Sequence, residues 1–361
     1  MSMQEALMIR REEYKMKHRP KESPDYIEEK DLNNISTEKV IGNIVEPGVT
    51  NGMARVFGHK ILWESNKTLS NINHLVFSRD GYLYAATDDG KIMKIDPNTG
   101  NNIWTYQVHK SSINSLVLDQ VGFLYTGSSD NTVKKIDPIT GKVKWIFDGH
   151  SDPVISLAIN GEGDIFSVDN NNIIKMIDSQ FGNEFWKFKV DGESIRTMKF
   201  GLDGYLYVGC LDGSVKLISY EAEKVMMNYM FHAHAIEDIV FDLQGNLYTC
   251  AWDNTLKKIN PTTFAFSWTK EIQPSDMIQV NMGLITGLTI SLDGYLYLTT
   301  YDGTIRKINP SNGNEIWKFE DYKKGHSTIT VGLDGYIYVA SYNTIKKMDD
   351  ELHLKGYRIL K

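Results

Sequence analysis

Apolar and polar residues alternate with a period of two in short runs that recur from about residue 61 to the end of the chain. In the first copy the runs predict four strands, at 72–77, 82–87, 91–95 and 102–106. Asp89-Gly90, between the second and third runs, has the composition of a tight hairpin turn, because glycine accepts the positive φ that this turn requires. The pattern therefore predicts four antiparallel strands in each unit.

The unit repeats seven times at nearly constant spacing. The phrase Asp80-Gly81-Tyr82-Leu83-Tyr84 returns at steps of 41, 41, 41, 41, 49 and 41 residues. A tryptophan series beginning at Trp63 also has steps of 41 residues with the same single step of 49, and Met227 holds one of its places. Units of this length that cannot bury an apolar face alone stack into a closed ring. The chain is thus predicted to be all-β, with a seven-bladed β-propeller at 59–361.

Position-by-position comparison of the units predicts what the blades bury. The fourth residue of the first strand is apolar in every unit, from Leu75 to Ile329, which indicates a core between blades. The residue before it is mostly small or polar and suits the crowded region near the axis. That column contains His74, Ser115, Ser156, Thr197, Asp238, Gly287 and Thr328.

Two motifs in the units resemble known propeller families. Ser129-Asp130-Asn131-Thr132 and Trp252-Asp253-Asn254-Thr255 are similar to a turn of WD repeats, and the run from Asp137 to Trp145 is similar to the PQQ-like repeat of quinoproteins. The chain therefore resembles the WD-repeat and PQQ-like propeller superfamily over roughly residues 61–361. Such motifs indicate the fold and leave the function open.

The chain departs from both families at positions that bear on function. The tryptophan of the usual buried WD network is replaced by isoleucine, and three histidines are expected to be structural partners of a turn rather than ligands. The histidines are His109, His150 and His232, and the matching turn residues are Asp130, Asn171 and Asp253. Quinone enzymes carry adjacent cysteines, whereas Cys210 and Cys250 lie on different blades. We therefore expect no cofactor and no metal.

The two ends of the repeat region compete to close the ring. Trp63 belongs to the fourth-strand column, yet no first, second or third strand precedes it. Residues 61–64 are therefore expected to form the outer strand of the last blade, which contains Gly335. The stretch 352–360 is the alternative for that place.

Residues 1–58 share nothing with the repeat and are predicted to be a separate N-terminal arm. They combine a short amphipathic helix with a second apolar patch, broken by Pro20 and Pro24. The segment is too polar for a core of its own, so it is interpreted as an arm that docks in a larger assembly, the alternative being a disordered leader. The candidate assembly residues are Met3, Leu7, Tyr14, Ile35, Val40 and Ile41.

Composition and charge limit the class of partner and the cellular compartment that we expect. A net charge of −7 and a pI near 5.8 argue against nucleic-acid binding. The start of the chain lacks the apolar region of a signal peptide and no run is long enough to span a membrane, so we expect cytoplasmic synthesis and no membrane insertion. Two separated cysteines agree with a reducing compartment. This expectation weakens a match to exported quinoproteins or to periplasmic propellers of envelope assembly.

Departures from the repeat provide the candidate binding face. The column before the turn between the second and third strands is polar at Asp88, Ser129 and Asn170, and becomes large and apolar in the next four units, at Leu211, Trp252, Tyr301 and Tyr342. The 49-residue step places a longer loop within 270–282, with Ile272, Met277 and Ile278 as apolar residues expected at its surface. Both features are expected on one face. The alternative is that these rings pack on the next blade.

The sequence contains no catalytic motif that we recognise, so the predicted function is non-enzymatic binding. The partner is expected to be a protein in a multi-subunit assembly, or a cell-surface receptor or glycan. A phage virion component of the tail, baseplate or adsorption type is the favoured setting, and an intracellular WD-type scaffold is the alternative. A propeller lyase or hydrolase with a site built from scattered loop residues is a further alternative.

Overall fold

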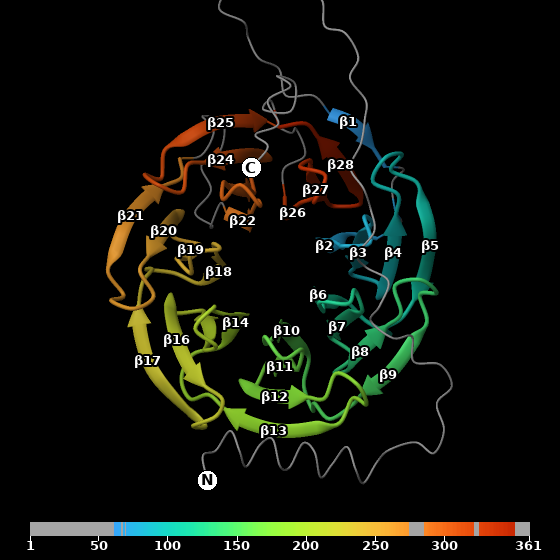
Figure 1. The fold of residues 1–361 in the computed structure, drawn as a ribbon, viewed down its shortest axis with the longest axis horizontal. Coiled ribbons are helices and arrows are strands. Elements are labelled where there is room, and N and C mark those ends of the chain that lie inside the picture. Colours follow the sequence, from blue (N-terminus) through green and yellow to red (C-terminus); the bar gives the residue numbers. More distant parts are fainter. Residues whose placement is uncertain (1–60, 66–67, 69, 274–284, 321–324, 351–361) are drawn as a thin grey trace, which may run out of the picture. The chain divides into compact units, whose positions relative to one another are not determined.

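The computed structural model describes residues 61–65, 68, 70–273, 285–320 and 325–350. These residues form seven sheets of four antiparallel strands arranged around a central axis (Figure 1). The predicted seven-bladed β-propeller is confirmed. The arm at residues 1–58 lies outside the described residues, so the boundary at 58/59 stays a prediction.

In each blade the strands a, b, c and d follow one another from the axis to the rim, and the first three blades use consecutive strands of the chain (Figure 1). Their strands are β2 (Ile72–Phe77), β3 (Leu83–Thr87), β4 (Lys91–Ile95) and β5 (Asn102–Gln107) in blade 1; β6 (Ile113–Leu118), β7 (Leu124–Ser128), β8 (Val133–Ile136) and β9 (Val143–Phe147) in blade 2; and β10 (Val154–Ile159), β11 (Ile165–Asp169), β12 (Ile173–Ile177) and β13 (Glu184–Lys189) in blade 3.

Blades 4 to 6 repeat this order, and blade 7 combines both ends of the repeat region. Their strands are β14 (Ile195–Phe200), β15 (Leu206–Cys210), β16 (Ser214–Ser219) and β17 (Lys224–Met230); β18 (Ile236–Phe241), β19 (Leu247–Ala251), β20 (Thr255–Ile259) and β21 (Phe266–Glu271); β22 (Ile285–Ile290), β23 (Leu296–Thr300), β24 (Thr304–Ile308) and β25 (Glu315–Glu320); and, in blade 7, β26 (Ser327–Val331), β27 (Ile337–Ser341), β28 (Thr344–Met348) and β1 (Ile61–Glu64).

Strand β1 closes the ring as predicted. It pairs antiparallel with β28, with Ile61 opposite Met348 and Glu64 opposite Lys346. The indole Nε1 of Trp63 donates to the carbonyl oxygen of Pro97 in blade 1 at 2.8 Å. The earliest described strand therefore joins the last blade to the first. The rival stretch 352–360 lies outside the described residues.

Four members of the tryptophan series, Trp63, Trp104, Trp145 and Trp268, pack on a turn glycine of the next blade. Trp63 lies against Gly100, where a Cβ atom would approach the ring Cε3 to 2.6 Å, and Gly100 has a φ of +74° that other residues resist. Trp145 and Trp268 make the same indole hydrogen bond to the following blade, each at 3.0 Å. The aromatic column thus holds blades together from outside the core, and this explains its constant spacing.

Met227 interrupts the tryptophan series, and the facing turn changes with it. Phe264 occupies the place of the turn glycine in blade 5 and has a φ of +56°. Its ring stacks on Tyr229 of β17, with ring centres 4.4 Å apart and an angle of 14° between the planes. The stacked aromatic pair occupies the place that Trp63 and Gly100 take at the junction of blades 7 and 1.

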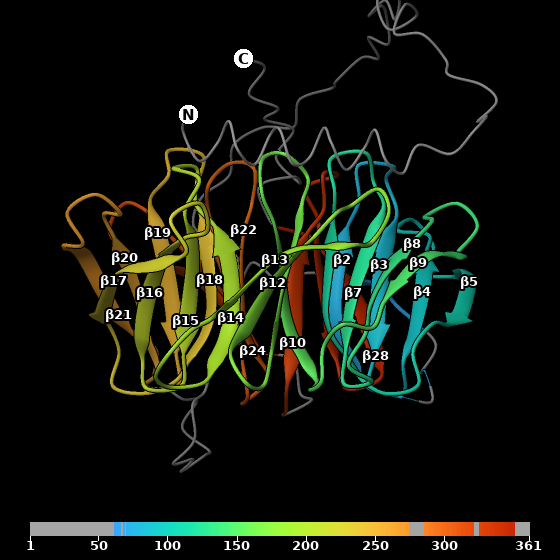
Figure 2. The same ribbon diagram turned by 90° about the horizontal axis from the view of Figure 1, so that it is seen from below.

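The connections divide between two faces of the ring (Figure 2). The loops from d to a lie beside the turns from b to c, because backbone bonds join them, as from Trp252 N to the Ala235 oxygen at 2.9 Å and from Leu211 N to the Ser194 oxygen at 2.9 Å. We call this side the b–c face. The turns from a to b and from c to d lie on the opposite side, the a–b face.

Candidate functional site

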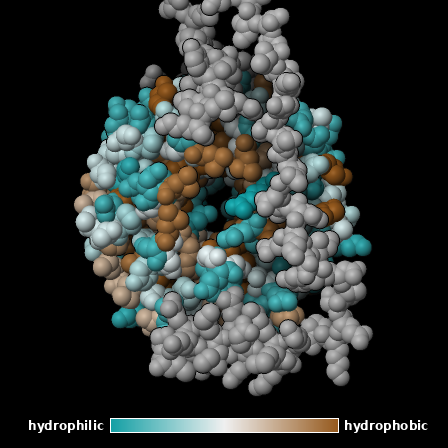
Figure 3. Space-filling model, viewed as in Figure 1, coloured by the Kyte–Doolittle hydropathy of each residue, from teal (hydrophilic) through white to brown (hydrophobic). Residues whose placement is uncertain are grey.

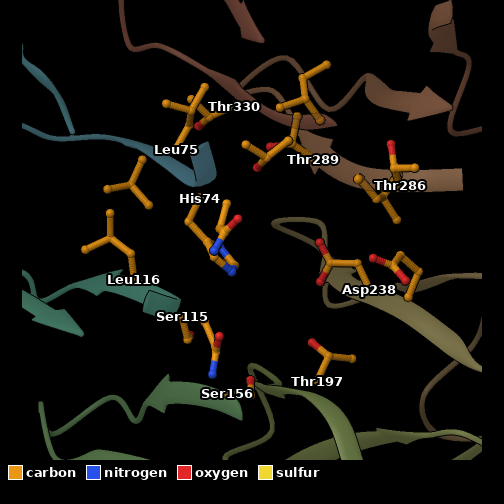
Figure 4. Close-up of a pocket in the computed structure, with 18 of the residues that line it drawn as sticks. His74, Leu75, Ser115, Leu116, Ser156, Thr197, Asp238, Thr286, Thr289 and Thr330 are labelled. Atoms are coloured by element: carbon orange, nitrogen blue, oxygen red, sulfur yellow. The ribbon is translucent and has the colours of Figure 1, made fainter. Parts of the chain in front are cut away.

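A central channel runs between the first strands of the blades and opens beside the predicted binding face. It encloses a cavity of about 630 Å³. Its lining includes the small or polar column that the sequence placed near the axis, with Ser115, Ser156 and Thr197 among its members (Figure 4). That expectation is confirmed.

A bulge at the same place in blades 1 to 6 shapes the mouth of the channel. The pairing of strands a and b shifts by one residue there, as between Ile195 and Thr197 and between Ile236 and Asp238. An extra residue in one strand re-aims its side chain. The residues at this place line the channel mouth, and they are Asn73, Asn114, Ile155, Arg196, Glu237 and Thr286.

Two ionisable side chains point into the channel from opposite sides of the ring, His74 from β2 and Asp238 from β18 (Figure 4). Loss of hydration in the channel lowers the pKa of His74 to about 4, so its imidazole is neutral at pH 7. The same loss of hydration raises the pKa of the Asp238 carboxyl to about 6, although the Lys199 ammonium acts in the opposite sense. The channel thus holds one group with a pKa of about 4 and one with a pKa of about 6.

The four apolar residues predicted for the binding face all reach solvent. The exposed fractions are 42% for Leu211, 37% for Trp252, 40% for Tyr301 and 44% for Tyr342. They belong to four consecutive blades, 4 to 7, and each follows strand b directly. The structure therefore places them on one arc of the b–c face. Whether they bind a partner stays a prediction.

Trp252 is held by charged groups at the channel mouth. Its Nε1 donates to Oε2 of Glu237 at 2.7 Å, and Arg196 donates to the same oxygen from Nε at 3.0 Å and from Nη2 at 2.8 Å. The guanidinium carbon of Arg196 lies 4.8 Å from the centre of the Trp252 ring. This arrangement fixes the orientation of the indole while leaving part of it exposed.

Tyr301 and Tyr342 both lie against the end of the loop that joins blades 6 and 7. The Tyr301 and His326 rings are 6.5 Å apart at their centres and nearly perpendicular. Gly325, next to His326, donates its N–H to the Tyr301 carbonyl oxygen at 2.8 Å. A Cβ atom at Gly325 would collide with the Tyr342 hydroxyl, so the Tyr342 ring lies against this glycine. Tyr301 and Tyr342 thus contact adjacent residues of this loop, His326 and Gly325.

Sequence comparison agrees with this architecture. The family model described as outer membrane protein assembly factor BamB matches residues 58–167 and 170–344, which is most of the chain. The chain belongs to this BamB family of PQQ-like propellers. No curated protein matches it significantly. We had expected a match to propellers of envelope assembly to be weak, and the family match corrects this expectation.

Ile272 does not contribute to the exposed surface of this BamB-family propeller. It is 1% exposed, its N–H donates to the Asn254 oxygen at 2.8 Å, and it packs in the core between blades 5 and 6. The prediction of a surface residue was wrong, because Ile272 shares the 41-residue register of Val190 and Phe231, which are also buried. Met277 and Ile278 lie outside the described residues, as do Met3, Leu7, Tyr14, Ile35, Val40 and Ile41.

The three histidines form buried networks on the b–c face, as expected for structural partners. His109 contacts the Asp130 carboxylate through Nδ1 at 2.9 Å, and Thr126 Oγ1 lies 2.7 Å from its Nε2. His232 repeats this arrangement with Asp253 at 3.1 Å and Thr249 at 2.8 Å. Burial lowers the pKa of both histidines despite the nearby carboxylates. Each neutral ring therefore donates to the aspartate and accepts from the threonine hydroxyl.

The network in blade 3 corrects one predicted partner. His150 Nδ1 lies 2.9 Å from Oδ2 of Asp169, not beside Asn171, and its Nε2 lies 2.7 Å from the Ser167 hydroxyl. Asp169 ends β11, two residues before the expected position, and fills the same space from there. The order Ser-His-Asp has the contacts of a hydrolytic triad, but Ser167 is 0% exposed, so its hydroxyl cannot meet a substrate in this conformation.

Sequence reasoning missed Arg196 and Glu237 at the channel mouth. Both are second residues of strand a, a position that the alternating pattern assigns to an ordinary strand face. Only the bulge turns them to the mouth. Among the described residues, no group of three or more His, Cys, Asp or Glu side chains could hold a metal ion. No helix in the described ranges is long and apolar enough to cross a bilayer.

Proposed function

We propose that this chain is a non-enzymatic binding module that holds a protein partner on the b–c face of blades 4 to 7. The observation that carries the proposal is that Leu211, Trp252, Tyr301 and Tyr342 are each about two-fifths exposed. Blades 1 to 3 fold with Asp88, Ser129 and Asn170 in the same column. Because the fold does not require large apolar residues there, binding accounts for them better than packing.

Family membership supports a role in an assembly. The matching family is described as an assembly factor of outer membrane proteins, and the present proposal takes from that description only the association with other proteins. We favour a protein partner over a receptor or glycan, because Trp252 has its N–H already paired with Glu237. A virion or an intracellular scaffold would each provide such an assembly.

The absence of enzymatic activity is part of the proposal. The histidine networks repeat in blades 2, 3 and 5 with threonine or serine, which is what a shared structural need produces. The alternative of a lyase or hydrolase would draw on His74, Asp238 and Lys199 in the channel. These groups come from blades 1, 4 and 5. Turnover that His74→Asn abolishes would support the alternative.

The test compares partner binding by wild-type protein and by the double variant Trp252→Ser, Tyr301→Ser. Loss of a buried aromatic anchor costs about 2 kcal/mol or more, so affinity should fall at least about thirtyfold for each ring that acts as an anchor. The partner is first identified by mass spectrometry of the complex isolated from the source cells. Its affinity for purified variants is then measured by calorimetry.

Two controls separate binding from folding. Ser129→Ala changes the same column in blade 2 and should bind normally. Trp252→Phe keeps a ring and Tyr301, and should bind more tightly than the double variant. Normal binding by the double variant, together with early melting, would show that the rings serve packing and would overturn the proposal.

A further inference from the structure

The a–b face carries a second apolar arc that the sequence analysis did not single out. The residue two places before the turn glycine is leucine in four consecutive blades, and these side chains are among the most exposed apolar groups of the described residues. The exposed fractions are 70% for Leu202, 77% for Leu243, 68% for Leu292 and 52% for Leu333. We call these four residues the leucine crescent.

The crescent follows the rim of the central opening. Figure 3 shows a brown arc beside that opening, over strands β18, β22 and β26. Arg79, Gln120 and Gly161 occupy the same place in blades 1 to 3, so the turn itself does not require leucine. Four aliphatic side chains kept in water on adjoining turns are the signature of a contact surface rather than of a core.

A hollow lies at the blade 7 end of the crescent. It has a volume of about 260 Å³, and Leu333 forms one wall. Phe77 and Leu118 contribute apolar walls, while Arg79 and Asp119 contribute polar groups. A hollow of this size and mixed lining can accept one aliphatic side chain of a partner while the remaining leucines cover its neighbours.

Carboxylates flank the leucines. Asp203 and Asp293 follow Leu202 and Leu292 directly and are exposed, and Glu223 is exposed on the neighbouring turn of blade 4. Two such surfaces facing each other would bring acidic groups together, which disfavours a second copy of this chain as the occupant. The same charge disfavours an anionic membrane surface. It matches a partner with lysine or arginine beside its apolar side chains.

We propose that the leucine crescent binds an amphipathic segment of a partner protein, with aliphatic side chains facing the four leucines and basic side chains facing Asp203, Glu223 and Asp293. This surface is on the face opposite Trp252 and Tyr301, and the inference does not rest on the proposed function of that face. With both surfaces occupied, the propeller would bridge two proteins across the thickness of the ring.

The test uses the full-length chain and a fluorescent 14-residue peptide of leucine and lysine in helical spacing. A scrambled isomer of the same composition controls for charge alone. We expect the amphipathic peptide to bind more tightly than the isomer. The variant Leu243→Ser, Leu292→Ser should weaken binding at least about tenfold, since each buried leucine contributes that order of affinity. Anisotropy titration gives the dissociation constants.

Val121→Ser is the matched control, because Val121 is 79% exposed on the same kind of turn in blade 2, outside the crescent. It should leave binding unchanged. Equal binding of the scrambled isomer, or equal loss in Val121→Ser, would overturn the proposal. So would binding to phosphatidylcholine vesicles that depends on the leucines, which would assign a lipid surface. Peptide binding that appears only after removal of residues 1–58 would assign the chain's own arm instead.

Discussion

Blades 1 to 3 and blades 4 to 7 share one fold but differ on both faces. On the b–c face the polar column of the first three blades becomes Leu211, Trp252, Tyr301 and Tyr342. On the a–b face the polar or small column becomes the leucine crescent. Both changes begin at blade 4, although the two columns lie at opposite ends of the strands.

Groups that maintain the fold show no such division. Buried tyrosines of strand b occur in both parts of the ring, and their hydroxyls donate to turn carboxylates, as from Tyr84 to Asp80 at 2.9 Å and from Tyr207 to Asp203 at 2.7 Å. The buried histidine networks also occur in both parts, at His109 and at His232. The difference between the two parts therefore does not follow from a folding requirement, and it supports the proposal that blades 4 to 7 hold the partners.

The largest effect on stability is expected at the junction of blade 7 and blade 1, where the two parts of the ring are joined. Trp63→Ala removes the ring that packs on Gly100 and the bond to Pro97, so it should lower the free energy of unfolding by about 3 kcal/mol. Ile103→Ala is the control, because Ile103 lies on strand β5 and is about half exposed. Thermal melts measure both. Equal stability of the two variants would contradict closure of the ring by β1.

A smaller effect is expected from the channel, where one ionisable group comes from each part. The lowered pKa of His74 means that its contribution to stability is complete above about pH 6.5 and is lost as the pH falls toward 4. The raised pKa of Asp238 means that its contribution is complete below about pH 3.8 and is lost as the pH rises through 6. In the wild-type protein the two dependences oppose each other.

Single variants should reveal the two opposed dependences. As the pH falls from 6.5 to 4, His74→Asn should gain stability relative to wild type and Asp238→Asn should lose it, each by about 2 to 4 °C in melting temperature. Lys199 and Glu237 also act on Asp238 and are unchanged in both variants. If both variants gain stability relative to wild type as the pH falls, or both lose it, the channel does not shift the pKa values of His74 and Asp238 in opposite directions.

The smallest effect on stability is expected from the arm. Removal of residues 1–58 leaves the paired strand β1 intact, so the melting temperature should not change. If the arm docks in an assembly, the shortened protein should nevertheless fail to enter the native complex, as size-exclusion chromatography would show. Unaltered incorporation would leave the arm without this role.

The sequence was sufficient for the fold because each blade repeats the same turn and core requirements. The step of 41 residues predicted the blades, and the isolated place of Trp63 predicted the closing strand. The same register could have shown that Ile272 is buried, since it continues the column of Val190 and Phe231. The leucine crescent was equally visible, as one column read across the units.

Other features could not be predicted because they depend on local geometry. The bulges that turn Arg196 and Glu237 to the channel mouth leave no mark in the alternation of strand a. The choice of Asp169 over Asn171 as the partner of His150 depends on which side chain reaches the ring from the end of β11. Asp169 lies only two residues from the predicted partner, Asn171, and a sequence register does not assign a side-chain contact to within two residues.

The most direct test of the division between blades 1–3 and blades 4–7 is hydrogen exchange of the native complex compared with the isolated protein. The account predicts protection at the turns around Trp252, Tyr301 and Tyr342, with the turns around Asp88, Ser129 and Asn170 exchanging equally in both states. Protection spread evenly over all seven blades, or confined to blades 1 to 3, would contradict it.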